Sequence, residues 1–149
     1  MPVILLPDNN KSVGPVLIMT NTCDINPENK RYHPPYVFYC PIIKLSKYED
    51  SIKEMMNGQQ LGDHISSIKR QEISSMLFLP RYSSIMKVDA IALLDRIVSY
   101  DIDYLTQDIL KDNRLFSLSD FGFYIFLIKV SIHMTRIREN IDRKNGIIH

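Results

Sequence analysis

The stretch Tyr-Val-Phe-Tyr-Cys-Pro-Ile-Ile, residues 36–43, decides the fold class of this chain. Aromatic and β-branched residues dominate its first half, and such residues are typical of β-strands. Pro41 has no N–H to give to a neighbouring strand, so we expect it at a sheet edge or at a bulge, with the strand continuing beyond it. The chain is therefore expected to contain a sheet built around this segment.

Further strand patterns lie on both sides of this segment. The nearly continuous apolar run at 16–20 is typical of a central strand, and a first strand is expected at 3–6. Residues 64–69 are expected to form a hairpin with 76–79. Two more strands, at 85–91 and 93–98, complete the expected sheet.

Helical patterns are fewer but clear. A helix is expected at 47–57, inserted between strands, with Ser46 as its N-cap. The longest helix is expected at about 117–141. Its apolar residues form two faces: Phe123, Phe126, Leu127, Val130 and Met134 on one, and Phe121, Tyr124, Ile125, Ile128 and Ile132 on another. A helix that is apolar on two sides is expected to be buried twice, once against its own sheet and once against a partner chain.

The composition is that of an ordinary soluble protein. The 149 residues carry a net charge of +1, with 23% charged and 45% hydrophobic residues, so no global field attracts nucleic acid or a membrane. The longest apolar stretch, 121–132, contains Lys129 and is too short to span a bilayer. The N-terminus lacks the pattern of a signal peptide. These features predict a cytoplasmic protein of one domain, residues 1–149, that makes no contact with a membrane.

Nothing in the sequence indicates a metal or another cofactor. Cys23 and Cys40 have neither metal-ligand nor disulfide-framework spacing. The four histidines include no pair at the spacing of metal ligands. We therefore expect no cofactor.

Three segments resemble the MazF/PemK family of plasmid-maintenance toxins, which are small β-barrel endoribonucleases. The segment Pro-Val-Leu-Ile-Met-Thr-Asn, residues 15–21, is similar to the Pro-Val-Leu-Val-Ile strand of that family. Residues 91–105 resemble its late strand and following turn, and residues from 118 onward resemble its terminal helix. The resemblance implies a mainly β fold, a small antiparallel β-barrel over about 1–105 with an inserted helix and a long C-terminal helix. It also implies a homodimer packed across the sheet and a groove for single-stranded RNA.

The chain departs from the family at its chemical groups. Gly14 stands where the family has an arginine just before the Pro-Val strand, and residues 41–43 fill the region where it has a serine or threonine. Such groups supply several kcal/mol of transition-state stabilisation. We therefore expect a divergent member of a toxin–antitoxin or defence-type system that lacks the usual catalytic residues and acts by binding a protein partner or single-stranded RNA.

The first candidate site follows the strand at 16–20. Thr22, Cys23 and Asp24 offer a hydroxyl, a thiol and a carboxylate, and a thiolate there could attack a phosphate or an acyl group, with His33 or His64 as general base. This keeps open the alternative of an active endoribonuclease with a non-standard site. The other interpretation is that Cys23 is a small buried residue and Asp24 caps a turn.

The second candidate site combines cations with aromatic rings. Arg81 and Tyr82 follow a proline in a loop, and Lys30 and Arg31 precede Tyr32. An arginine beside an aromatic ring suits a phosphate clamp with a stacking platform for a base. These four residues are expected to line a groove for single-stranded nucleic acid, although exposed loops often carry basic and aromatic residues without any such role.

Overall fold

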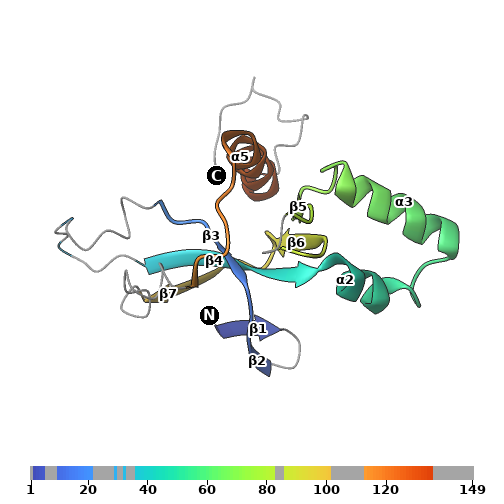
Figure 1. The fold of residues 1–149 in the computed structure, drawn as a ribbon, viewed down its shortest axis with the longest axis horizontal. Helices are drawn as coiled ribbons and strands as arrows, with labels where there is room; N and C mark the ends of the chain where they lie inside the picture. The colour runs from blue at the N-terminus through green and yellow to red at the C-terminus, as the bar shows by residue number, and fades with distance from the viewer. Residues whose placement is uncertain are drawn as a thin grey trace, which may run out of the picture.

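A computed structural model describes residues 2–5, 10–21, 29, 32, 36–82, 86–101 and 113–135. It contains strands and helices in the following order (Figure 1): β1 (Pro2–Leu5), β2 (Asn10–Val13), β3 (Val16–Ile18), β4 (Tyr36–Lys44), α2 (Leu45–Ile52), α3 (Gly58–Lys69), β5 (Met76–Leu79), β6 (Ala90–Leu93), β7 (Val98–Asp101) and α5 (Asp120–Thr135).

The main sheet has five strands, and every pairing in it is antiparallel. The strand order is β3-β4-β6-β5, and β7 also pairs with β4. β1 and β2 form a separate two-stranded hairpin. The antiparallel sheet expected from the sequence is therefore confirmed, within a mixed α/β fold.

The expected barrel closure is not seen in the part of the chain that the structure describes. There β3 and β5 each pair with a single strand, so the sheet keeps two open edges, and β3 is an edge strand rather than a central one. One physical reason is that 64–69 is helical, which removes a strand from the expected set. The predicted hairpin of 64–69 with 76–79 is wrong.

The helix α3 owes its start to a capping box. The Asn57 side chain accepts a hydrogen bond from the Gln60 backbone N–H at 2.9 Å, and the Gln60 side chain accepts one from the Asn57 N–H at 3.2 Å. Such a box satisfies two backbone donors that a helix start leaves unpaired. The inserted helix predicted at 47–57 is accordingly shorter, Leu45–Ile52, and a second helix begins where it was expected to end.

Side chains of the sheet alternate between two cores. Leu77, Leu79, Ala90 and Ala92 join a cluster with Phe126 of α5. The intervening positions join a second cluster with α2 and α3, made of Leu45, Ile68, Ile91 and Leu93 with Phe78 and other partly buried residues. Because successive residues of a strand point to opposite faces, α5 covers one face of the sheet, and α2 and α3 cover the other (Figure 1).

A turn and a proline interrupt the ladder along β4 at the same place. β6 pairs with Ile42–Lys44 and β7 pairs with Tyr36–Tyr39, both along the same edge of β4. Residues 94–97 form a turn between β6 and β7, opposite Pro41, which has no N–H to donate. Pro41 thus lies in an interior strand, paired with Val16 of β3, and not at a sheet edge; the turn on its other side is where its missing N–H is tolerated.

The outer edge of β5 is closed by a side chain. Gln71 donates from its side-chain amide to the Phe78 carbonyl at 2.8 Å and accepts from the Phe78 N–H at 3.1 Å, so it replaces a neighbouring strand at that residue. Gln71 has a φ of 64°, the left-handed conformation that often ends a helix. The Glu72 N–H bonds to the Ser67 carbonyl and the Gln71 N–H to the Ile68 carbonyl, which is the Schellman pattern.

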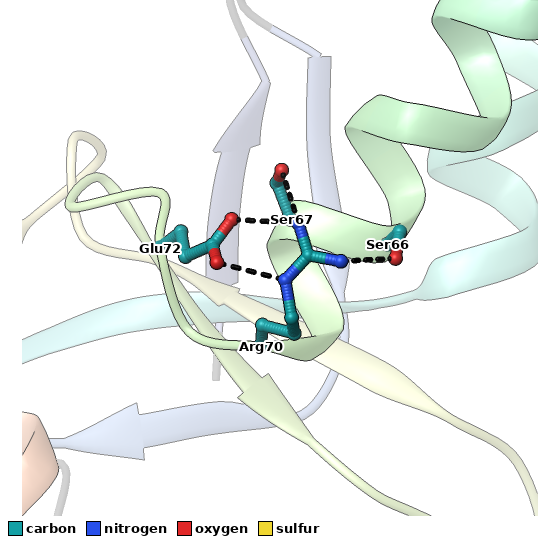
Figure 2. Close-up of polar contacts among 4 residues, drawn as sticks. All are labelled: Ser66, Ser67, Arg70 and Glu72. Carbon is teal, nitrogen blue, oxygen red and sulfur yellow. Dashed lines mark hydrogen bonds and ion pairs between the residues drawn. The ribbon is translucent and has the colours of Figure 1, made fainter.

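Polar contacts of Arg70 hold this turn on the end of α3 (Figure 2). Its guanidinium donates to both carboxylate oxygens of Glu72, at 2.7 and 2.9 Å, and to the hydroxyls of Ser66 and Ser67 at 2.6 and 3.3 Å. The hydrogen bond from Arg70 lowers the pKa of Glu72. This network brackets Gln71 and positions its amide against β5.

Candidate functional site

The structure describes only part of the predicted site residues. Thr22, Cys23 and Asp24 lie outside the described residues, as do Lys30 and Arg31 and the candidate base His33. Arg81 and Tyr82 are described, and both are exposed. The site can therefore be built around Arg81 and Tyr82.

Arg81 lies on an open groove of about 300 Å³ between the helices and the ends of the sheet strands. The groove is lined from α2 by Leu45, Ser46 and Glu49, from α3 by Ile65 and Lys69, and from the segments flanking β5 and β6 by Arg81, Lys87, Val88 and Asp89. Three cations and two carboxylates thus share this concave surface. The groove arises because the Leu45 N–H donates to the Asp89 carbonyl at 2.9 Å, which holds the start of α2 against the start of β6.

Asp89 is already engaged by its neighbours in the groove. Its carboxylate accepts a hydrogen bond from the Arg81 backbone N–H at 3.0 Å and lies 3.9 Å from the Lys69 ammonium. Within the described part of the chain, the Arg81 guanidinium and the Lys87 ammonium have no hydrogen-bond or ion-pair partner. Both cations are exposed, so they are available to an anion from solution.

A short backbone bridge brings the two unpaired cations together. The Tyr82 N–H donates to the Met86 carbonyl at 2.8 Å, and the Met86 N–H donates back to the Tyr82 carbonyl at 3.2 Å. This pairing sets Arg81 and Tyr82 beside Met86 and Lys87. The Tyr82 side chain is 77% exposed, so its ring is free to stack on another ring.

The strand end that leads to the first candidate site lies elsewhere. The Thr20 hydroxyl accepts a hydrogen bond from the Phe38 N–H at 2.7 Å, beside the exposed rings of Tyr36 and Phe38. Arg81 is tied through Asp89 to Leu45, which directly follows β4. Phe38 and Leu45 are seven residues apart along an extended segment, which is about 20 Å. Thr20, at the end of the strand, and Arg81, at the groove, are therefore near opposite ends of β4.

The candidate base His64 and the second cysteine, Cys40, have structural roles. His64 lies on α3, where its Nε2 is 2.9 Å from the Tyr48 hydroxyl of α2, so it joins the two helices. Cys40 is fully buried, and burial together with the charge of Asp95 raises the pKa of its thiol to about 12. A thiol with so high a pKa is not a nucleophile at neutral pH.

The helix α5 presents an unusual arrangement. Its sheet-facing side buries Phe126 and also Lys129, whose ammonium donates to the Ile73 carbonyl at 2.6 Å. Its outer side exposes seven large apolar residues: Phe121, Phe123, Tyr124, Leu127, Ile128, Ile132 and Met134. The prediction that this helix is apolar on two sides is confirmed, although the faces differ from those predicted, because Leu127 and Met134 lie on the exposed side and Phe126 on the buried one.

Sequence reasoning missed Lys69 and Lys87 as members of the groove. An isolated lysine in a loop or at a helix end carries no signal of its own. The packing of the end of α3 against Asp89 brings Lys69 to the groove, and the Tyr82–Met86 bridge brings Lys87 beside Arg81. The exposed segment Pro-Arg-Tyr at 80–82 was the one sequence feature that pointed to this location.

The residues that the structure describes contain neither a metal-binding cluster nor a membrane-spanning helix. Those residues include no group of three or more His, Cys, Asp or Glu side chains arranged to hold a metal ion. No helix in the described ranges is both long enough and apolar enough to cross a bilayer. No protein-family model matches the chain, and neither the characterised proteins nor the solved structures include a detectable relative.

Proposed function

We propose that this chain is a divergent relative of the MazF/PemK toxins, with a sheet derived from their barrel, that acts by binding single-stranded RNA rather than by cleaving it. The observation that carries the proposal is the groove at Arg81, which is lined by two unpaired cations, with the exposed ring of Tyr82 on the residue that follows Arg81. Arginine and lysine bind backbone phosphates, and an aromatic ring stacks on a base of any sequence. In single-stranded RNA, the phosphate and the face of the base are both accessible at every nucleotide.

The site residues have distinct roles in this proposal. The Arg81 guanidinium binds one phosphate through two hydrogen bonds, and the Lys87 ammonium binds the next as a point charge. Tyr82 stacks on the intervening base. The Asp89 carboxylate positions Arg81 by accepting a hydrogen bond from the Arg81 backbone N–H. Lys69 lies beside this carboxylate, so Asp89 does not face the phosphate as a free charge.

Two positions support binding without cleavage. Gly14 carries no side-chain functional group where the related toxins have an arginine. Pro41 and Ile42 are buried in the sheet where those toxins have a hydroxyl, so this part of β4 offers no exposed nucleophile. The alternative is an endoribonuclease that uses Thr22, Cys23 and Asp24.

The test is fluorescence anisotropy with a labelled single-stranded RNA of mixed sequence. We expect binding that weakens with salt, since each phosphate contact releases condensed cations and contributes a slope of about −0.7 in the plot of log affinity against log salt concentration. Arg81→Gln should weaken binding about tenfold and reduce that slope by one contact. Arg114→Gln is the matched control, because Arg114 is an exposed arginine outside the groove that bonds to Ser117.

Three results would count against the proposal. RNA that does not bind at low salt would reject it, as would equal losses in the Arg81→Gln and Arg114→Gln variants. RNA that is cut by the wild type and left intact by Cys23→Ser would establish the enzymatic alternative instead.

Protein binding is a second candidate function, carried by a different surface. The seven exposed apolar residues of α5 form a larger patch than a monomeric protein usually leaves in water. A protein partner of a toxin–antitoxin or defence-type system would cover such a patch.

A further inference from the structure

The exposed face of α5 points to association between two copies of this chain. We propose that two α5 helices pack against each other, antiparallel, around a two-fold axis near Ile128. The inference rests on the protein-binding candidate above and does not depend on RNA binding. It also differs from the sheet-to-sheet dimer that the family resemblance implies, because the contact is made by the outer side of the helix.

The first argument is the kind of residue that α5 leaves exposed. The seven apolar side chains, named above, are between 37% and 74% exposed. α5 lies as an outer layer on its face of the sheet, away from α2 and α3 (Figure 1). The side chain that would normally face water, Lys129, is instead buried against the sheet. The helix therefore presents to solvent the residues that usually form an interior.

The second argument is area. Seven such side chains at these exposures present on the order of 800 Å² of surface, from typical side-chain areas. A stable interface of standard size buries about 800 Å² on each partner. The α5 face alone thus supplies the area that each copy must contribute to a dimer.

The third argument is charge. Asp120, at the first position of α5, and the buried Lys129 are the charged residues of this helix. Between Phe121 and Met134 the outer face carries no charge. A face without charges has no charge complementarity to an acidic or basic partner protein. The same face can pack against a copy of itself without charge repulsion.

The fourth argument is shape, and it selects the antiparallel arrangement. The N-terminal half of the outer face carries three rings, Phe121, Phe123 and Tyr124. The C-terminal half carries no such ring: it exposes the unbranched Met134 and the aliphatic Ile132 with the small residues Ser131 and Thr135. An antiparallel pair sets the bulky half of one helix against the small half of the other, which allows close packing of the two axes. A parallel pair would place rings against rings and leave a gap at the other end.

The dyad near Ile128 gives a specific pairing that can be tested. Tyr124 and Ile132 lie four residues on either side of Ile128, so Tyr124 of one copy faces Ile132 of the other. Sedimentation equilibrium of the full chain, from about 1 μM to about 100 μM, should give twice the chain mass of 17.4 kDa at the upper concentrations. Tyr124→Lys and Ile132→Glu should each weaken the dimer at least tenfold, because each buries two charges without partners, one in each copy.

A mixture of the two variants decides the arrangement. Mixing Tyr124→Lys with Ile132→Glu should restore a dimer, because the introduced charges of opposite sign then face each other across the axis. Met55→Lys, a substitution at an 80% exposed position outside α5, is the control and should leave the dimer unchanged. Circular dichroism melting of each variant checks that the fold is retained, which is expected because both residues are exposed in the monomer.

Several outcomes would overturn the inference. A wild-type chain that stays monomeric at about 100 μM, or a dimer that neither substitution weakens, would reject it. A mixture that does not regain the dimer would reject the antiparallel packing. A monomer that floats with lipid vesicles and loses this property on Tyr124→Lys would assign the α5 face to a lipid surface instead. RNA binding by Arg81 is measured separately, so a failure of either proposal can be recognised without the other.

Discussion

Replacing Lys129 by methionine should change how the stability of this protein depends on pH. Lys129 is 4% exposed, and its ammonium donates a hydrogen bond to the Ile73 carbonyl at 2.6 Å. Burial lowers the pKa of this lysine from 10.5 to about 8. Lys129→Met keeps a long unbranched side chain at the position and removes the charge.

The direction of the effect follows from proton binding. Between about pH 8 and pH 10.5 the unfolded chain keeps the proton on Lys129 and the folded chain releases it. The contribution of Lys129 to the free energy of unfolding of the wild type therefore rises with pH across this interval, by at most about 1.4 kcal/mol per pH unit. Over the whole interval, this contribution to the free energy of unfolding rises by roughly 1–3 kcal/mol. The lower value applies if water screens the ammonium. Below pH 8 both states are protonated, and the folded state bears the full cost of a buried charge.

Urea denaturation at fixed protein concentration measures this dependence. From about pH 7 to about pH 10, the wild type should become more stable relative to Lys129→Met. The contributions of other titrating groups cancel in this difference, because both proteins carry the same groups. Lys47→Met, at an exposed lysine of α2, should show no such change. A difference for Lys129→Met that stays constant over this range would refute the burial argument.

Three further predictions test local features of the fold. Gln71→Ala should lower the free energy of unfolding by about 2 kcal/mol in urea denaturation, because it leaves both backbone groups of Phe78 without their partner; an unchanged stability would show that the edge of β5 does not need this side chain. Asn57→Ala should cost about 1 kcal/mol through loss of the capping box, with Asn57→Ser retaining most of that stability; equal stabilities of the two variants would contradict the role of the cap. Cys40 should remain unmodified by iodoacetamide at neutral pH until the protein is unfolded, because its buried thiol has a pKa of about 12. Peptide mass mapping distinguishes Cys40 from Cys23, and rapid labelling of Cys40 in the folded protein would contradict the assigned burial.

Strands with a continuous or β-branched pattern were predictable, and one helix was not. The segment at 36–43 is a strand, as expected, since strand propensity acts locally. Its proline lies opposite the turn between β6 and β7, which the sequence did not predict. Residues 64–69 have apolar residues that fit a short strand, but the capping box at Asn57 and Gln60 starts a helix that continues through them. Local side-chain contacts decided between two patterns that periodicity alone could not separate.

The candidate site was predictable only in its loop. Pro-Arg-Tyr at 80–82 indicated an exposed cation beside a ring, and the structure places Arg81 at a groove and leaves the ring of Tyr82 exposed. The partners of Arg81 in that groove come from α2, α3 and the start of β6, which are distant in sequence. Their convergence depends on the pairing of β5 with β6 and on the packing of both helices over one face of the sheet.

The sequence by itself determined that this chain forms a β-sheet, that a long apolar helix follows it, and that this helix has more apolar surface than one sheet can cover. These results come from residue types and spacings that act over a few neighbours. The tertiary structure alone decided which side of α5 faces the sheet. Since apolar residues surround this helix, periodicity could not choose a side, and packing against β5 and the carbonyl of Ile73 selected the one that buries Lys129 and leaves the rings of Phe121, Phe123 and Tyr124 exposed.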